Sequence, residues 1–353
     1  MDRTQVAVLG ATGAVGQRFV QLLQDHPWFE LKVLLASGKS AGKRYIDAVD
    51  WRLQEKIPEP VRDEKVEEIH PKILKDESIE LVFSALPGSI AGDIELELAS
   101  AGFFVFSNAS AHRMDPDVPL LVADINPDHL ALVAHQRKSR PGYIVTNPNC
   151  TVTGFITGLK PLDVEFGIND VVMTSYQALS GAGYPGVPSL DIVGNIIPYI
   201  PGEEEKVESE CKKILGRISE SSIEPSSVNV IASCARVPVR DGHLESVLVR
   251  PKSDASLEEI LKAFYLYKSK KSEKLPSAPE KPIIVTEEKD RPQPLFDIYS
   301  GSPKRAKGMS ITVGRIKKIG DQIRFFLLVH NTIRGAAGCT IMNAELAKLE
   351  GFL

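Results

Sequence analysis

The stretch Gly10-Ala-Thr-Gly13-Ala-Val-Gly16 joins a short apolar run to a segment with helical periodicity, close to the N-terminus. The run before it, Val6 to Leu9, is continuously apolar, as expected of a strand that is buried on both faces. The segment after it, residues 14–25, places apolar side chains at helical spacing: Val15, Phe19, Leu22 and Leu23. A glycine-rich turn between a buried strand and a helix is typical of the first unit of a doubly wound α/β sheet.

Strand and helix continue to alternate as far as about residue 150. A helix is predicted over residues 91–101, and further short apolar runs predict strands over 31–36, 79–83, 103–106 and 144–145. Strands that are buried on both faces and separated by helices predict an α/β fold with a Rossmann-type, doubly wound parallel sheet.

The pattern changes to α+β in residues 151–330. Strands are predicted over 171–176, 228–234 and 244–249, a helix from Ser256, and a hairpin over 311–316 and 323–329 around Gly320-Asp321. This predicts a second domain with a mainly antiparallel sheet. Residues 269–294 are rich in Lys, Glu and Pro and predict an exposed connection.

The last helix is predicted over about 335–349. It places four apolar residues on one face: Cys339, Met342, Leu346 and Leu349. We expect this helix to return to the first domain, which would then comprise residues 1–150 and about 331–353.

The composition excludes several classes of protein. The chain has 353 residues, enough for two domains, and its formal net charge of -4 gives no reason to expect nucleic acid or an anionic membrane as a partner. No apolar run approaches the ~20 residues that a membrane span needs. The four cysteines are scattered and form no C-x-x-C pair, so we expect no disulfide framework, no metal and a reducing, cytoplasmic location.

The glycine loop predicts a dinucleotide site. Its glycines allow a tight turn and a close approach of the backbone to phosphate, and the N–H groups of the following helix then face the pyrophosphate. An NAD enzyme usually has Asp or Glu at the end of the second strand, whereas this chain has Ser37, Lys39, Ser40 and Lys43 there. Hydroxyls and positive charge suit the 2′-phosphate of NADP; the alternative is a solvated polar loop.

Cys150 follows the last predicted parallel strand, in Thr146-Asn-Pro-Asn-Cys150. If a helix begins at about Thr151, its dipole would stabilise a Cys150 thiolate and lower the pKa of the thiol. A free cysteine is more often a small buried apolar residue, which fits Cys234 and Cys339 but not a residue after Asn-Pro-Asn.

A thiol nucleophile needs an acid–base partner. His243 lies in the turn Asp241-Gly-His243, just after a predicted strand, and Arg236 stands seven residues earlier. A lone histidine is often structural, but this short segment offers an imidazole and a guanidinium together.

Seven segments agree in order and spacing with one family over essentially the whole chain: 10–16, 107–113, 147–151, 177–183, 203–206, 236–243 and 330–338. They resemble the aspartate-semialdehyde dehydrogenase family, and its archaeal and fungal branch more than the usual bacterial form. The resemblance implies that the second domain serves catalysis and dimerisation.

The resemblance implies a role for each matching residue. Cys150 would be the nucleophile, His243 the acid–base catalyst, and Gln177 would orient the acyl group. The substrate would be held through its carboxylate by Arg236, its amino group by Glu203, and its phosphate by Arg113, Asn149 and Lys206. The cofactor would contact Gly10, Thr12, Gly13, Ala14, Val15, Gly16, Ser37, Ser40, Lys43, Ser84, Ser180, Gly181 and Asn331. Glu204 and Glu205 adjoin Glu203, so the register stays open, and 203–206 could also be only a charged helix start.

The implied activity is the reversible, NADPH-dependent conversion of L-aspartyl 4-phosphate to L-aspartate 4-semialdehyde through a Cys150 thioester. That reaction would serve the biosynthesis of lysine, threonine, methionine and isoleucine, in a homodimer or homotetramer that binds small-molecule substrate and phosphate.

Three alternatives remain at this stage. The stretch Ser180 to Gly186 also resembles archaeal reductases of malonyl- or succinyl-coenzyme A. The reductases of glyceraldehyde phosphate and acetylglutamyl phosphate agree with fewer motifs. A non-catalytic NADP-binding redox sensor would keep the glycine loop without needing both Cys150 and His243.

Overall fold

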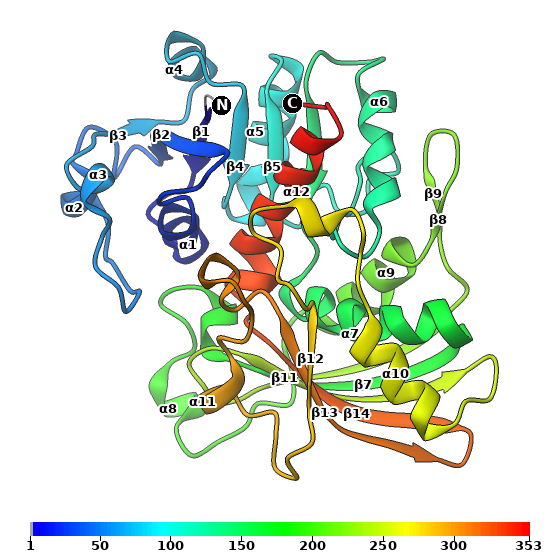
Figure 1. The fold of residues 1–353 in the computed structure, drawn as a ribbon. Helices are drawn as coiled ribbons and strands as arrows, with labels where there is room; N and C mark the ends of the chain where they lie inside the picture. Colours follow the sequence, from blue (N-terminus) through cyan, green and yellow to red (C-terminus); the bar gives the residue numbers. More distant parts are fainter. Residues whose placement is uncertain (1–2) are drawn as a thin grey trace.

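The computed structural model describes residues 3–353 and contains two six-stranded sheets, with the parallel sheet in the upper part of Figure 1 and the mixed sheet in the lower part. The first sheet has the order β3-β2-β1-β4-β5-β6, and all its strand pairs are parallel. The strands are β1 (Thr4–Leu9), β2 (Phe29–Ala36), β3 (Val66–Glu68), β4 (Leu81–Ser84), β5 (Phe104–Ser107) and β6 (Tyr143–Thr146). The predicted doubly wound sheet is confirmed, and the strand order reverses between β1 and β4, where such folds bind their ligands.

Helices cover both faces of the parallel sheet. Val8 and Phe83 lie in a buried cluster with side chains of α1 (Ala14–Leu22) and α12 (Gly338–Leu349), whereas Leu9 and Val82 point to the other face, toward α5 (Gly88–Ser100). Alternate strand residues thus enter two separate cores, which explains why the strands are continuously apolar.

The C-terminal helix α12 packs on the parallel sheet, where Ile341 and Met342 join the cluster around Val8. The burial extends beyond the face that carries the four predicted apolar residues, because α12 is buried on all sides from Gly338 to Ala347. Leu349 is 40% exposed, at the end of the helix.

The second sheet has the order β10-β7-β11-β14-β13-β12. Its three central pairs are antiparallel, whereas β10 pairs with β7, and β12 with β13, in parallel. The sheet is therefore mixed, and the prediction of a mainly antiparallel sheet holds for its centre but not for its edges. The strands are β7 (Ile168–Gln177), β10 (Asn229–Arg236), β11 (His243–Pro251), β12 (Ile283–Thr286), β13 (Ile311–Ile319) and β14 (Gln322–Val329).

The edge strand β12 corrects the prediction that residues 269–294 form only an exposed connection. Four residues of this segment pair with β13, and Ser277 donates its backbone N–H to the buried carboxylate of Glu345. Proline and lysine on both sides hide so short a strand from a pattern search.

Three helices cover one face of the mixed sheet: α7 (Cys150–Phe166), α9 (Glu203–Ile214) and α10 (Leu257–Leu266). The predicted start of α10 is confirmed, because Ser256 and Glu259 form a reciprocal capping box. The remaining helices and strands are short: α2 (Tyr45–Ala48), α3 (Glu59–Arg62), α4 (Pro71–Asp76), α6 (Leu132–Gln136), α8 (Ser189–Ile192), α11 (Pro294–Asp297), β8 (Arg217–Ile218) and β9 (Ile223–Glu224). Within residues 3–353, no helix combines the length and apolar character that crossing a membrane requires.

Candidate active site

Cys150 is the first residue of α7, at the point where the chain passes from the parallel to the mixed sheet. Asn149 caps this helix: its Oδ1 accepts hydrogen bonds from the backbone N–H groups of Thr151 and Val152, at 2.8 and 3.4 Å. The predicted helix start is confirmed. The Asn-Pro-Asn turn is itself buried, with Asn147 only 1% exposed, and Cys150, the predicted nucleophile, is half-buried.

The structure brings the predicted nucleophile and its acid–base partner together across 93 residues of sequence. Sγ of Cys150 lies 3.1 Å from Nε2 of His243, which begins β11. The backbone N–H of Ala178 donates to Nδ1 of the same ring at 3.1 Å and fixes the plane of the imidazole. The distance is that of a nucleophile and its acid–base partner, and the hydrogen bond to Nδ1 leaves the proton of the neutral ring on Nε2, which faces the sulfur.

The predicted fall in the pKa of the Cys150 thiol is wrong for this state of the protein. Burial, with a smaller effect of the Glu203 carboxylate, raises that pKa to about 12, and Arg113 and Arg236 only partly oppose the rise. Desolvation moves a pKa by up to ~3–5 units, whereas a helix N-terminus contributes only ~0.3–1 kcal/mol. Burial and the Arg236 charge lower the pKa of His243 to about 3, so both groups are neutral at neutral pH.

Arg236 ends β10 and lies beside the Cys150–His243 pair. Its Nη1 donates to the carbonyl oxygen of Ala178 at 2.7 Å, and its side chain is buried. A Cβ atom added at Gly181 would lie 2.8 Å from this Nη1 and 3.2 Å from Nε2 of His243. Gly181 therefore leaves room for both side chains at the same spot.

Glu203 is the only one of the three adjacent glutamates that points into this cluster. Its Oε1 accepts from Nδ2 of Asn149 at 2.9 Å and from Nε2 of Gln177 at 3.0 Å. Glu204 instead accepts from the backbone of Cys234, and Glu205 is exposed. Glu203, the first residue of helix α9, is thus the glutamate that lies beside Asn149 and Gln177, as the predicted register requires.

Arg113 and Lys206 differ in their exposure to solvent. Arg113 is 8% exposed, donates from Nη1 to Glu210 at 2.9 Å, and has a buried Nε with no partner among the described residues. Lys206 is 40% exposed and its Nζ lies 3.9 Å from Oε2 of Glu203, which places it at the rim of the cluster.

The glycine loop fits the dinucleotide role predicted for it. Gly10 has φ +73°, and a Cβ there would lie 2.7 Å from the carbonyl oxygen of Ala85; a Cβ at Gly16 would lie 2.1 Å from the oxygen of Gly10. These glycines hold the loop and the start of α1 tightly against the strands. A cavity of about 100 Å³ adjoins the loop and reaches from Ala14 to Ser180 and Thr332. Thr332 Oγ1 is buried without a partner among residues 3–353, so a polar group remains for a ligand.

The other predicted cofactor residues are placed as follows. Nδ2 of Asn331 donates to Oγ of Ser180 at 2.8 Å, so these two lie together between the sheets. Ser37, Ser40 and Lys43 follow β2 in a turn whose Ser37 and Lys43 are exposed. Ser84 is fully buried and its hydroxyl donates to Glu95 at 2.6 Å, which directs that hydroxyl away from the role expected of it. Thr12, Gly13 and Val15 belong to the glycine loop and the start of α1.

Comparison with known proteins identifies the family of this chain. Residues 5–133 match the model of the semialdehyde dehydrogenase NAD binding domain, and residues 159–334 match that of the semialdehyde dehydrogenase dimerisation domain. The chain belongs to the semialdehyde dehydrogenase family.

The names of the relatives refer to two different substrates. The chain is 50% identical to an aspartate-semialdehyde dehydrogenase of Archaeoglobus fulgidus, over 98% of both chains. It is 40% identical to an NADP malonyl-CoA reductase of Metallosphaera sedula, over 100% of this chain and 99% of the relative. The crystal structure of aspartate semialdehyde dehydrogenase with NADP from Candida albicans superposes with a TM-score of 0.90 at 39% identity, and each chain is covered completely. The predicted family is confirmed.

Two buried carboxylates of this semialdehyde dehydrogenase were not predicted. Glu245 follows His243 by two residues on the same strand, so both side chains point to one face of the sheet. Burial raises the pKa of Glu245 well above its ordinary value, and Glu203 raises it further. Glu210 lies seven residues after Glu203 on α9. Same-face spacing on a strand and on a helix was the signal that could have found them.

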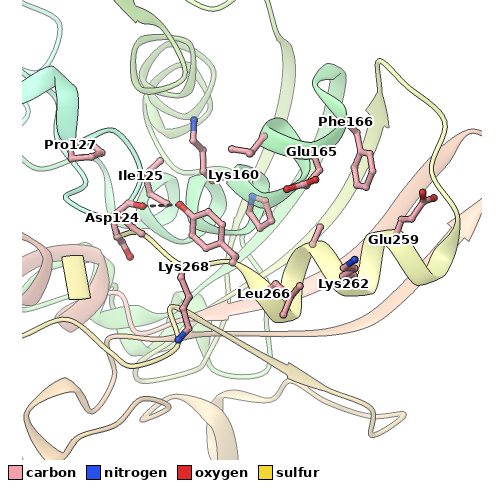
Figure 2. A pocket seen from close by; sticks show the side chains of 15 residues that line it. Asp124, Ile125, Pro127, Lys160, Glu165, Phe166, Glu259, Lys262, Leu266 and Lys268 are labelled. Atoms are coloured by element: carbon pink, nitrogen blue, oxygen red, sulfur yellow. Dashed lines mark hydrogen bonds between the residues drawn. The ribbon is translucent and has the colours of Figure 1, made fainter. Parts of the chain in front are cut away.

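A larger cavity of about 560 Å³ lies elsewhere in this dehydrogenase, between the end of α7, helix α10 and residues 124–127 (Figure 2). It is lined by lysines, glutamates and apolar side chains, but none of the predicted catalytic or substrate residues reaches it. At one wall the hydroxyl of Tyr267 donates to the carbonyl oxygen of Asp124 at 2.7 Å. The candidate active site is therefore the cluster around Cys150.

Proposed function

We propose that this semialdehyde dehydrogenase reversibly converts L-aspartyl 4-phosphate to L-aspartate 4-semialdehyde with NADPH, through a thioester on Cys150. The observation that carries the proposal is the convergence of three groups on one buried site: the Cys150–His243 pair, the guanidinium of Arg236 and the carboxylate of Glu203. Arg236 suits the α-carboxylate of an aspartyl group and Glu203 suits its ammonium group. The 50% identical relative from Archaeoglobus fulgidus supports the same substrate.

The glycine loop and the start of α1 would hold the pyrophosphate of NADP, with Ser37, Ser40 and Lys43 toward its 2′-phosphate. Asn331 and Ser180, which are hydrogen-bonded to each other, would lie by the nicotinamide. When bound, NADPH would supply the hydride that reduces the thioester carbonyl.

The protein's own groups would then divide the reaction into two stages. Nε2–H of His243 lies 3.1 Å from Sγ and donates to the sulfur as it attacks the acyl carbon, because the hydrogen bond from Ala178 to Nδ1 leaves the ring proton on Nε2. The thiol proton of Cys150 leaves with the phosphate. The carbon–sulfur bond forms, the bond from carbon to the phosphate oxygen breaks, and Arg113, Asn149 and Lys206 hold the departing phosphate. Gln177 keeps the acyl group in line with the sulfur.

In the second stage His243 handles the protons of the reduced adduct. The adduct oxygen is stabilised by backbone N–H groups near Cys150, and its collapse releases the aldehyde and restores the sulfur. In the reverse direction phosphate, held by the same cationic side chains, attacks the thioester in place of water. Residues 159–334 match a family model named for dimerisation, so we expect a homodimer or homotetramer.

The second candidate is reduction of malonyl- or succinyl-coenzyme A, which the Metallosphaera sedula relative favours. Neither acyl group carries an amino group, so the buried carboxylate of Glu203 would face no cation of the substrate. A silent redox sensor would not need Sγ and Nε2 at hydrogen-bond distance.

The test is to follow NADPH absorbance in two parallel reactions. One contains enzyme, NADP, phosphate and aspartate semialdehyde; the other contains enzyme, NADPH and malonyl-coenzyme A. Phosphate-dependent formation of NADPH in the first supports the proposal, whereas activity in the second alone rejects the aspartyl substrate.

A further inference from the structure

Helix α9 directs a stripe of charged side chains at the candidate active site. Glu203, Glu210 and Lys213 are spaced by seven and three residues, which places them on one side of the helix, and all three are buried. Glu203 belongs to the substrate site already described, whereas the other two have no part in the proposed reaction.

Glu210 joins two active-site segments that are distant in sequence. Its Oε1 accepts from Nη1 of Arg113 at 2.9 Å, and its Oε2 accepts from the backbone N–H of Asn149 at 2.7 Å. Asn149 in turn caps the helix that begins at Cys150. A single carboxylate, 2% exposed, thus lies between the arginine and the residue before the nucleophile.

Lys213 fixes the loop that carries the arginine. Its Nζ donates to three carbonyl oxygens, those of Arg113, Asp115 and Val118, at 2.7, 2.7 and 2.8 Å. The loop and the side chain of Arg113 are therefore both attached to α9, one turn apart on the same helix.

The guanidinium of Arg113 and the backbone N–H of Asn149 can both be bound at this position only by a carboxylate. Glutamate offers two acceptor oxygens, and charged hydrogen bonds of this kind are the stronger ones. Glutamine has one acceptor oxygen, so its NH2 group would meet either the guanidinium or the N–H of Asn149, and one of the two contacts would be lost.

We propose that Glu210 is a positioning residue: it holds Arg113 and Asn149 on one carboxylate and so sets the anion-binding guanidinium at a fixed place relative to Cys150. The role of Arg113 toward phosphate rests on the proposed function. Nη2 of Arg113 donates to the carbonyl oxygen of Asn108 at 2.8 Å, and the buried Nε of the same side chain has no partner among the described residues, so this N–H is one donor that remains for the anion.

The test compares Glu210→Gln with Glu205→Gln, a matched change at an exposed position of the same helix. Cys150 is alkylated with iodoacetamide, and the concentration of inorganic phosphate that protects it is measured. The expected result is a roughly tenfold weaker protection by phosphate in Glu210→Gln, as the loss of one charged hydrogen bond predicts, with wild-type protection in the control. The KM for phosphate should rise likewise, while the KM for aspartate semialdehyde changes little.

A merely structural role gives a different result. Glu210→Gln would then lower the melting temperature and the fraction of active enzyme, while the remaining enzyme would bind phosphate as tightly as the wild type, and this overturns the proposal. In an Arg113→Gln background, Glu210→Gln should cause a smaller further loss of protection, because only its contact with Asn149 remains to be lost; a fully additive loss also overturns the proposal.

Should Glu210→Gln not fold, Glu210→Asp serves the same purpose, because it keeps the charge but is too short to reach both donors. It should weaken phosphate protection selectively, and wild-type protection would overturn the proposal. Alkylation needs no turnover, so the outcome is separate from the proposed reaction: an enzyme inactive with the semialdehyde can still pass or fail this test. If phosphate does not protect wild-type Cys150, the positioning role fails whatever the substrate is.

Discussion

The substitution Gly181→Ala tests the geometry of the site most sharply, because it adds one methyl group between two functional side chains. That Cβ would lie 2.8 Å from Nη1 of Arg236 and 3.2 Å from Nε2 of His243. Ordinary contact needs ~3.5 Å, and the nearest imidazole atom is Cε1 at 3.1 Å, so the guanidinium must retreat by about 0.7 Å and the imidazole by about 0.4 Å. The backbone of Gly181 does not have a positive φ and therefore accepts alanine, which confines the damage to these neighbours.

A misplacement of 1 Å can cost about 100-fold in rate, so kcat/KM for aspartate semialdehyde should fall by about 10- to 100-fold. The measurement is steady-state formation of NADPH, with the melting temperature as a check on folding. Gly92→Ala is the control, because its added Cβ meets only Ala111 at an ordinary 3.5 Å. A kcat/KM within about twofold of the wild type would refute the packing of Arg236 and His243 around Gly181, since displaced groups cannot keep their effect.

Four further predictions follow from named groups. Arg236→Lys should raise the KM for the semialdehyde by roughly tenfold or more with a smaller change in kcat, because a point charge replaces a two-pronged donor; an unchanged KM would exclude Arg236 as the carboxylate clamp. Alkylation of Cys150 by iodoacetamide should accelerate about tenfold per pH unit between about pH 6 and 9, since burial holds the thiol pKa near 12, and a plateau below about pH 7 would show a preformed thiolate. Burial lowers the pKa of His243 from 6.5 to about 3, so between these pH values the unfolded chain binds a proton that the folded chain does not. Stability should therefore fall as the pH drops from 6.5 toward 3, and His243→Gln should reduce the slope of that fall by up to ~1.4 kcal/mol per pH unit. An identical dependence of the melting temperature on pH in the variant would contradict this prediction. Asp124→Asn leaves the fully buried Arg334 without its carboxylate and should cost ~3–5 kcal/mol in denaturant unfolding; a loss below about 1 kcal/mol would show that the pair contributes little.

Local patterns predicted the parallel sheet and the start of α7 well. The glycine loop, the buried strand before it and the helix after it are encoded within about twenty residues, so no distant partner is needed to recognise them. Cys150 at a helix start follows in the same way from the Asn-Pro-Asn turn that precedes it.

Features set by distant partners could not be predicted. Glu210 contacts Arg113 and Asn149, which are 97 and 61 residues away, and nothing in its own segment marks that contact. The parallel pairing of the two edge strands of the mixed sheet was not predicted for the same reason, because the sequence pattern of a strand does not show which strand it will pair with. The shift in the pKa of Cys150 was predicted in the wrong direction, because the helix start can be recognised locally whereas burial depends on the whole fold.

The central claim is that Cys150 carries a thioester that phosphate resolves. It is tested most directly by mixing the enzyme rapidly with NADP and aspartate semialdehyde without phosphate, then adding phosphate. We expect a burst of about one NADPH per active site, little turnover until phosphate arrives, and no burst from Cys150→Ser, as covalent catalysis predicts. Continuous turnover without phosphate, or a full burst from Cys150→Ser, would contradict the account.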